Sequence, residues 1–115
     1  MHISIDFYTL EDGRKPAKDF LDGLDQKMRA KMVRTIELLE KNGPDLRKPY
    51  SEYLEDGIFE LRAKVGSDIS RELYFFFYDK KAILTNGFLK KSQKTPRKQL
   101  ELAKKYKRDY EERYR

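Results

Sequence analysis

The chain has no cysteine, a single histidine and no long run of hydrophobic residues. The lack of cysteine excludes disulfides, a cysteine nucleophile and thiolate ligands for a metal ion. The one histidine, His2, gives little support for a histidine metal cluster, and any Ser-His-Asp triad would depend on it alone. A stretch of about 18 apolar residues, as a membrane span requires, is absent. We therefore expect no metal, no cofactor and no membrane partner.

The first ten residues do not read as a secretory signal. They lack a basic n-region, and Asp6 interrupts their apolar stretch. Together with the missing cysteines, this predicts a cytoplasmic protein. A length of 115 residues is short for two domains, so we expect one domain spanning residues 1–115.

Positive charge is concentrated in the second half of the chain. Residues 58–115 contain 16 basic and 8 acidic residues, whereas residues 1–57 contain 10 and 12. The formal net charge is +6. Such an asymmetry is typical of a protein with a polyanionic partner, most often nucleic acid and otherwise an acidic protein. A solvated face that only maintains solubility is the alternative.

The first half is predicted to form one strand and two helices. Residues 3–8 alternate between apolar and polar side chains, as a strand does. Helical spacing predicts a short helix over residues 16–24, with proline at its first position, and a longer one over residues 25–43, capped by its first residue. Residues 44–57 are expected to form a mostly polar loop.

The second half changes to a period of two residues. Residues 58–65, 69–78 and 82–89 are each predicted to form a strand, and the short turns between them indicate an antiparallel meander. A last helix is expected from a Thr95 cap to about Tyr110. The predicted order is β-α-α-β-β-β-α, an α+β fold with a small antiparallel sheet and helices packed on one face.

Basic residues on the predicted strands are candidates for a site. The alternation of the strand over residues 58–65 places Arg62 and Lys64 on one face. Arg71, on the next strand, joins them only if the strand register allows it. Crowded positive charges favour the neutral form of a lysine, which can then act as a general base, whereas an arginine stays charged and clamps phosphate. This set suits metal-free RNA scission by 2′-OH attack, and a solvated sheet face is the alternative.

More basic residues follow the third strand. Lys90, Lys91, Lys94, Arg97 and Lys98 can all donate to phosphate, and the segment leads into a helix N-terminus, which itself favours anions. The alternative for Lys90 and Lys91 is a pair of charges at the end of a strand that prevents pairing with another chain.

Two further features of the strands have a structural and a functional interpretation. The aromatic run over residues 74–78 either fills the core or stacks bases. Glu60 and Glu72 are expected to pair across strands with Arg62 or Arg71.

Several of these residues carry a family resemblance. The segment from Gly57 to Arg62, then Arg71, then the segment from Asn86 to Pro96 resemble the RelE/ParE superfamily of toxins, in particular its phage-derived HigB-like subgroup. The most specific part is the string of glycine, phenylalanine, lysine pair and Lys-Thr-Pro between Gly87 and Pro96. The resemblance extends over nearly the whole chain and implies a RelE-like fold.

The resemblance implies the toxin of a type II toxin–antitoxin system. Similar proteins cut messenger RNA in the ribosomal A site by 2′-OH attack, and their partner is a cognate antitoxin, here expected to be of the helix-turn-helix type. Carried over by position, the catalytic candidates are Arg62, Lys64, Arg71 and Lys91, and the RNA-binding candidates are Lys90, Lys94, Arg97 and Lys98. Asn86 stands where many relatives carry histidine, which implies a lysine-rich route or weak activity.

Two other functions are compatible with the same sequence. ParE-like members of the superfamily inhibit DNA gyrase and are not nucleases, and fold alone does not separate the two activities. A non-catalytic basic module that binds nucleic acid would show strongly salt-dependent binding without cleavage.

Overall fold

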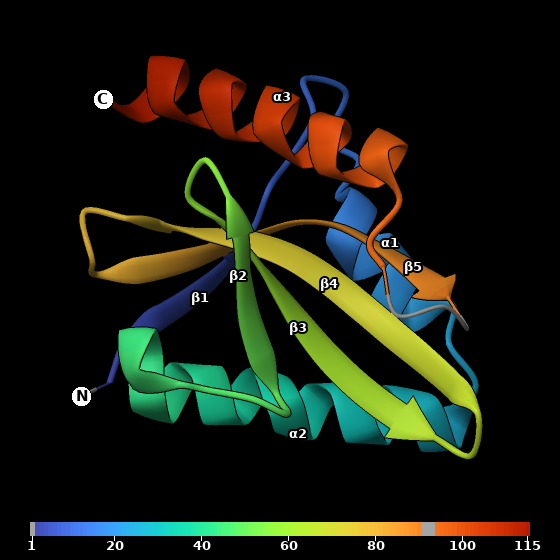
Figure 1. The fold of residues 1–115 in the computed structure, drawn as a ribbon. Coiled ribbons are helices and arrows are strands. Elements are labelled where there is room, and N and C mark those ends of the chain that lie inside the picture. Colours follow the sequence, from blue (N-terminus) through green and yellow to red (C-terminus); the bar gives the residue numbers. More distant parts are fainter. Residues whose placement is uncertain (1, 91–93) are drawn as a thin grey trace.

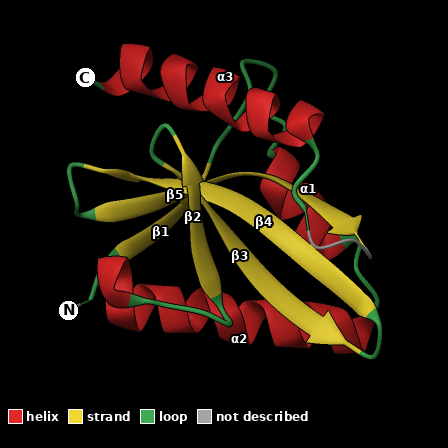
Figure 2. Cartoon of the chain, in the orientation of Figure 1, coloured by secondary structure: helices red, strands yellow, loops and turns green. Residues whose placement is uncertain are grey.

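A computed structural model describes residues 2–90 and 94–115, and Figures 1 and 2 show the arrangement of its elements. The elements are β1 (Ser4–Phe7), α1 (Pro16–Asp22), α2 (Gln26–Asn42), the short 3₁₀ helix η1 (Gly43–Asp45), β2 (Ser51–Glu55), β3 (Ile58–Val65), β4 (Asp68–Phe77), β5 (Lys81–Lys90) and α3 (Arg97–Tyr114). None of the described helices is long and apolar enough to cross a membrane.

The strands form one five-stranded sheet in the order β1-β5-β4-β3-β2. β3, β4 and β5 form the predicted antiparallel meander, and β1 joins its far edge parallel to β5. The α+β class is therefore confirmed, with every predicted strand and helix present, but the sheet is mixed rather than wholly antiparallel.

One strand was not expected. The predicted loop over residues 44–57 contains β2, which pairs with β3 through a turn at Asp56 and Gly57, both with positive φ. The turn chemistry is plain in the sequence, but β2 itself is short and carries three polar residues among five. As an edge strand with one neighbour, it needs no continuous apolar face, so the alternation that identifies a strand is weak.

The helices differ from the expected arrangement because they cover both faces of the sheet (Figure 1). α1 and α2 pack on one face, in a core that includes Leu61 and Tyr74, and α3 packs on the other, over Ile58 and Phe75. Both faces of β4 are buried, since neighbouring Tyr74 and Phe75 are 1% and 0% exposed. A strand with aromatic residues in both phases needs cover on both sides, which one layer of helices cannot supply.

Glu72 is buried in the core beneath α1 and α2. It lies opposite Leu61 of β3 and Gly87 of β5, and its side chain is fully buried. Neither carboxylate oxygen has a hydrogen-bond partner among the described residues. Burial raises the pKa of Glu72 well above its ordinary value, so the folded protein retains this proton to higher pH than the unfolded chain does. Its contribution to folding stability therefore falls as pH rises above about 4.5, the unfolded value.

Replacing Glu72 by methionine should stabilise the protein. A Glu72→Met side chain has similar volume and no charge to bury, so we expect a gain of about 1–3 kcal/mol at pH 8 and a smaller gain at pH 5. Urea unfolding at pH 8 and at pH 5 measures the gain in unfolding free energy at each pH. Glu112→Met, on the exposed side of α3, is the control. A gain that is equal at both pH values would contradict a neutral buried carboxyl.

Candidate functional site

Strand register brings the basic residues of the central strands to one face of the sheet. Arg62 of β3 lies directly opposite Arg71 of β4, and Lys64 lies opposite Ile69, two positions along. Directly opposite residues in antiparallel strands share a face. Arg71 therefore joins Arg62 and Lys64, on the face that α3 covers.

A buried carboxylate, Glu60, joins the two arginines. Its side chain is fully buried, and its Oε1 accepts a hydrogen bond of 2.7 Å from Arg62 Nε. Its Oε2 lies 3.5 Å from Arg71 Nη1 and also accepts a hydrogen bond from Thr95 Oγ1. The expected pairing of Glu60 with the strand arginines is present. In surroundings that exclude water these charge interactions are strong, so Glu60 fixes β3, β4 and the entry to α3 relative to one another.

Arg62 is the arginine that reaches solvent. Its side chain is 23% exposed, against 1% for Arg71, and it also contacts Glu52 of β2. Burial disfavours the charged form of Arg62, but the hydrogen bonds and negative charges of Glu60 and Glu52 outweigh this effect and raise its pKa. The hydrogen bond from Lys48, at 2.9 Å, and the charge of Arg62 lower the pKa of Glu52. Arg62 is thus held as a cation at the surface.

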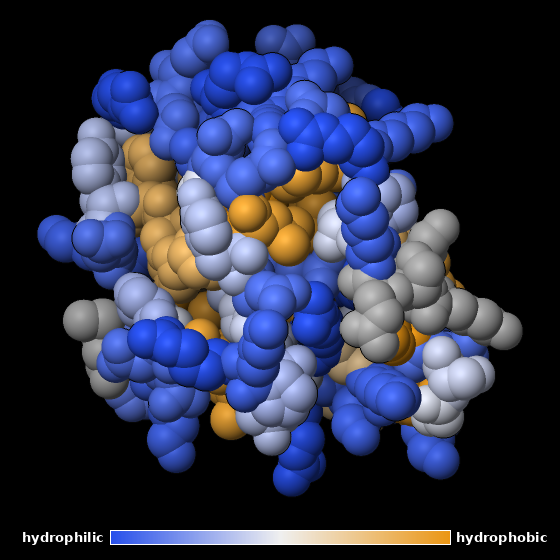
Figure 3. Space-filling model, in the orientation of Figure 1, coloured by the Kyte–Doolittle hydropathy of each residue, from blue (hydrophilic) through white to orange (hydrophobic). Residues whose placement is uncertain are grey.

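Arg62 opens into a groove of about 520 Å³ between β2 and the start of α3. The groove is lined by polar residues from both sides and two leucines: Glu52, Tyr53, Leu54, Glu55, Arg62, Lys94, Thr95, Arg97 and Leu100. Figure 3 shows hydrophobic side chains on this face of the molecule, between the hydrophilic side chains over α3 and those over α2. The groove therefore offers apolar and aromatic contact next to cations.

Ion pairs hold the start of α3 against the turn between β2 and β3. Arg97 donates two hydrogen bonds of 2.9 Å to the two oxygens of Glu55. Lys104 contacts Glu55 and lies 2.9 Å from Asp56. The hydrogen bonds from Arg97 and then from Lys104 lower the pKa of Glu55 to about 2. Arg97, predicted to bind RNA, therefore lines the groove but also secures α3.

Of the remaining candidates, Lys94 lines the groove, whereas Lys64 and Lys98 are not part of its lining. Lys64, Lys94 and Lys98 are exposed. Lys91 lies outside the described residues, and only the backbone of Lys90 is described, at the end of β5.

The start of α3 corrects one prediction. Pro96 occupies the N-cap position and Arg97 begins the helix, whereas Thr95 was expected to be the cap. The Thr95 hydroxyl donates to Glu60 instead of satisfying the helix N-terminus. A buried carboxylate is a stronger acceptor than a neutral group, and sequence spacing alone gave no sign of this long-range contact.

Two further residues behave differently from expectation. Glu72 does not pair with either arginine, because it lies on the opposite face of the sheet. Glu52 is a contact of Arg62 that sequence reasoning missed, because it lies on the unexpected strand β2. The contact between Glu60 and Arg62 could be predicted from the sequence, because residues two positions apart on a strand lie on the same face.

Asn86 is 3% exposed and anchors α3. Its Nδ2 donates to Gln99 Oε1 at 3.0 Å and to the Gln99 backbone carbonyl at 3.2 Å. Its Oδ1 accepts a hydrogen bond from the Thr85 hydroxyl at 2.7 Å. In this protein the position therefore serves to hold the helix on the sheet.

Comparison with family models matches residues 19–108 to the phage-derived Gp49-like proteins. The chain belongs to the Gp49-like family. Among solved structures, this Gp49-like protein is similar to a chain of an archaeal RelE–RelB complex from Pyrococcus horikoshii OT3, with 16% sequence identity over 82% of this chain and 100% of that one and a TM-score of 0.50. The fold is thus that of RelE, as the resemblance implied, and the family match agrees with the phage-derived subgroup that the sequence resembles. Curated proteins gave no significant match.

Removing the negative charge of Glu60 should destabilise the Gp49-like protein strongly. A Glu60→Gln side chain leaves Arg62 and Arg71 facing one another without their shared counterion, and breaking a buried ion pair in this way costs about 3–5 kcal/mol. Urea unfolding measures the loss, with Glu37→Gln on the exposed side of α2 as the control. A loss as small as that of the control would show that the two guanidiniums do not depend on Glu60.

The attachment of α3 should weaken in acid. Because the pKa of Glu55 is lowered to about 2, its contribution to stability is complete above pH 4.5 and disappears as pH falls toward 2. Thermal unfolding of the wild type and Glu55→Gln between pH 6 and pH 2 should therefore give two melting temperatures that converge in acid. A difference that is constant over this range would exclude the ion pairs as its cause.

Proposed function

We propose that this Gp49-like protein is the toxin of a type II toxin–antitoxin system and that it cleaves messenger RNA on the ribosome. Family membership and the RelE fold support the toxin assignment. The observation that carries the nuclease proposal is the pair of guanidiniums on one buried carboxylate, beside an open groove with further cations. An arginine held as a cation at the edge of a groove suits a phosphodiester better than an uncharged substrate.

The proposed reaction is an intramolecular transesterification. The 2′-hydroxyl of a ribose gives up its proton to a base while its oxygen forms a bond to the adjacent phosphorus. The bond from that phosphorus to the 5′-oxygen of the next nucleotide breaks, and the leaving 5′-oxygen takes up a proton. The products are a 2′,3′-cyclic phosphate and a 5′-hydroxyl end. Charge increases on the non-bridging oxygens in the transition state, where a preorganised cation gives the greatest acceleration. The protein's task is to supply that cation and to align the ribose with the phosphate.

Within this proposal, Arg62 contacts the scissile phosphate. Its guanidinium is partly exposed in the groove, and the phosphate oxygens replace its contact with Glu52. Arg71 is a positioning residue, because its buried guanidinium acts on Arg62 through Glu60. Lys64 lies two positions along β3 on the same face. We assign it either a contact with the RNA backbone or the removal of the 2′-hydroxyl proton.

The basic segment after β5 completes the proposed interface. Lys94 and Arg97 line the groove with Arg62, and exposed Lys98 follows on the first turn of α3. Lys90 and Lys91 are assigned to the same RNA strand on sequence grounds. Together these side chains would follow the backbone on both sides of the scissile bond.

The proposed protein partner is a cognate antitoxin. The similar archaeal structure is a complex of RelE with RelB, which supports a partner of this class. The basic excess of residues 58–115 favours an acidic segment of that partner, and we retain the helix-turn-helix type as the expected form of the rest.

Loss of Arg62 should abolish toxicity without unfolding the protein. We expect induced expression of the wild type to arrest translation, and primer extension on extracted messenger RNA to show cuts in register with codons only where ribosomes are present. Arg62→Ala should reduce cleavage at least 100-fold, in line with the loss of one transition-state donor. The matched control is Arg34→Ala, at an exposed position of α2 on the other face of the sheet.

Three results would reject the proposal in different ways. Continued translation with failing DNA supercoiling would identify a gyrase inhibitor. Salt-dependent RNA binding without any cut would identify a passive binding module. Full activity of a folded Arg62→Ala protein would reject the site assignment alone.

A further inference from the structure

Four aromatic rings form a continuous row at the end of the molecule remote from the groove. Tyr78 lies 4.5 Å from Phe77, Phe77 lies 5.0 Å from Tyr110, and Tyr110 lies 4.6 Å from Tyr114, measured between ring centroids. We call these four residues the aromatic row. Leu100 of α3 lines the groove and Tyr110 of α3 belongs to the row, so ten residues of the helix, about 15 Å at 1.5 Å per residue, separate the two.

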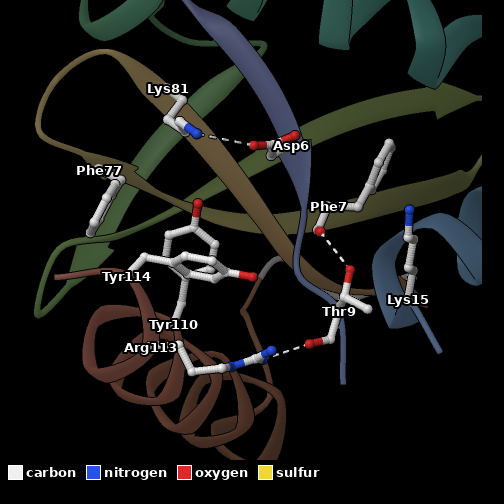
Figure 4. A pocket seen from close by; sticks show the side chains of 9 residues that line it. All are labelled: Asp6, Phe7, Thr9, Lys15, Phe77, Lys81, Tyr110, Arg113 and Tyr114. Carbon is white, nitrogen blue, oxygen red and sulfur yellow. Dashed lines mark hydrogen bonds and ion pairs between the residues drawn. The ribbon is translucent and has the colours of Figure 1, made fainter. Parts of the chain in front are cut away.

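The row begins and ends on exposed rings. Tyr78 is 66% exposed and Tyr114 57%, which are high values for aromatic side chains in a folded protein. Figure 4 shows Phe77, Tyr110 and Tyr114 together at one side of a pocket of about 470 Å³, with Lys81 and Arg113 at its margins. Ring faces that are open to solvent beside a pocket can take up further flat groups by stacking.

Tyr78 is held at the tip of the β4–β5 hairpin in a strained conformation. Tyr78 and Asp79 have φ of 51° and 55°, and the Lys80 amide donates to the Phe77 carbonyl at 3.2 Å across them. Two successive positive φ values are typical of a type I′ turn, which favours Asn-Gly. A bulky aromatic residue is unfavourable there. Strain that presents an exposed ring at a surface points to a binding role rather than to the needs of the fold.

Cations surround the row. Lys80 is exposed in the same turn, and the Lys81 ammonium lies 3.4 Å from Asp6. The Arg113 guanidinium lies 5.8 Å from the centre of the Tyr114 ring and pairs with Asp109 at 2.7 Å. Stacking rings with cations beside them are the combination that binds single-stranded nucleic acid without sequence preference.

We propose that the aromatic row is a second contact surface for the RNA, on which unpaired bases stack. This inference rests on the proposed function for the choice of RNA as the ligand. The alternative occupant is a protein, since exposed tyrosines also occur at protein interfaces. RNA is favoured because Lys80, Lys81 and Arg113 lie beside the row and because the exposed Tyr78 ring, on a strained backbone, suits a flat base.

Fluorescence anisotropy with a labelled single-stranded RNA 12-mer tests the row without the ribosome. We expect Tyr78→Asn to weaken binding by 5-fold or more, a stacking loss of ordinary size, while raising the melting temperature, because asparagine tolerates positive φ. Tyr78→Phe should bind as the wild type does. Tyr50→Asn, at an exposed tyrosine on another part of the surface, is the control and should change neither quantity.

Other outcomes would overturn the inference. Equal binding of a 12-base-pair RNA duplex, or unchanged affinity of Tyr78→Asn, would mean that charge alone attracts RNA. Loss of the antitoxin complex in Tyr78→Asn with RNA affinity unchanged would assign the row to a protein. If RNA binding depends on Tyr78 but the protein never cuts RNA on ribosomes, the aromatic row is supported and the nuclease function is rejected. If the protein cuts RNA but its RNA binding does not depend on Tyr78, the nuclease function is supported and the aromatic row is rejected.

Discussion

The Glu60 carboxylate is the contact on which the proposed site depends. Register places Arg62 and Arg71 directly opposite one another, an arrangement that is unfavourable for like charges on neighbouring strands. One buried anion between them turns this repulsion into a bridge, and its contact with Thr95 extends the bridge to the segment before α3. The sheet face under α3 is therefore polar near the start of the helix and apolar further along, where Ile58 and Phe75 form a core. The groove lies at the polar end.

Two buried glutamates on adjacent strands of this sheet have different surroundings. Glu60 and Glu72 are both fully buried, but Glu60 faces two guanidiniums whereas Glu72 faces the apolar core beneath α1 and α2. Glu60 thus has cationic partners within its site, whereas burial without such a partner raises the pKa of Glu72. The alternation of a strand sends neighbouring residues to opposite faces, so the position of a glutamate within its strand selects between these outcomes.

Local patterns predicted most of the fold, and long-range contacts account for what they did not predict. The β3–β5 meander, α2 and the α+β class follow from periodicity and turn residues, which act over a few positions. β2 was missed because an edge strand with polar residues has no clear period. For the site, alternation placed Arg62 and Lys64 together, but the register that added Arg71 and the partners of Glu60 depend on residues 11 and 35 positions away. Patterns of residue spacing act over a few positions and do not predict contacts at such separations.

Net charge proves to be a coarse guide to where an anion binds. The second half of the chain has the basic excess, but two of its cations, Arg97 and Lys104, are held by Glu55 and Asp56 from the first half. Those ion pairs join α3 to the β2–β3 turn and leave less charge for a ligand than a count suggests. In the proposed function, attraction of the RNA depends on exposed cations such as Lys64 and Lys98, and recognition of the phosphate depends on the geometry of Arg62. Under that proposal, charge attracts the RNA over a distance, whereas the fixed guanidinium selects the phosphate that is bound.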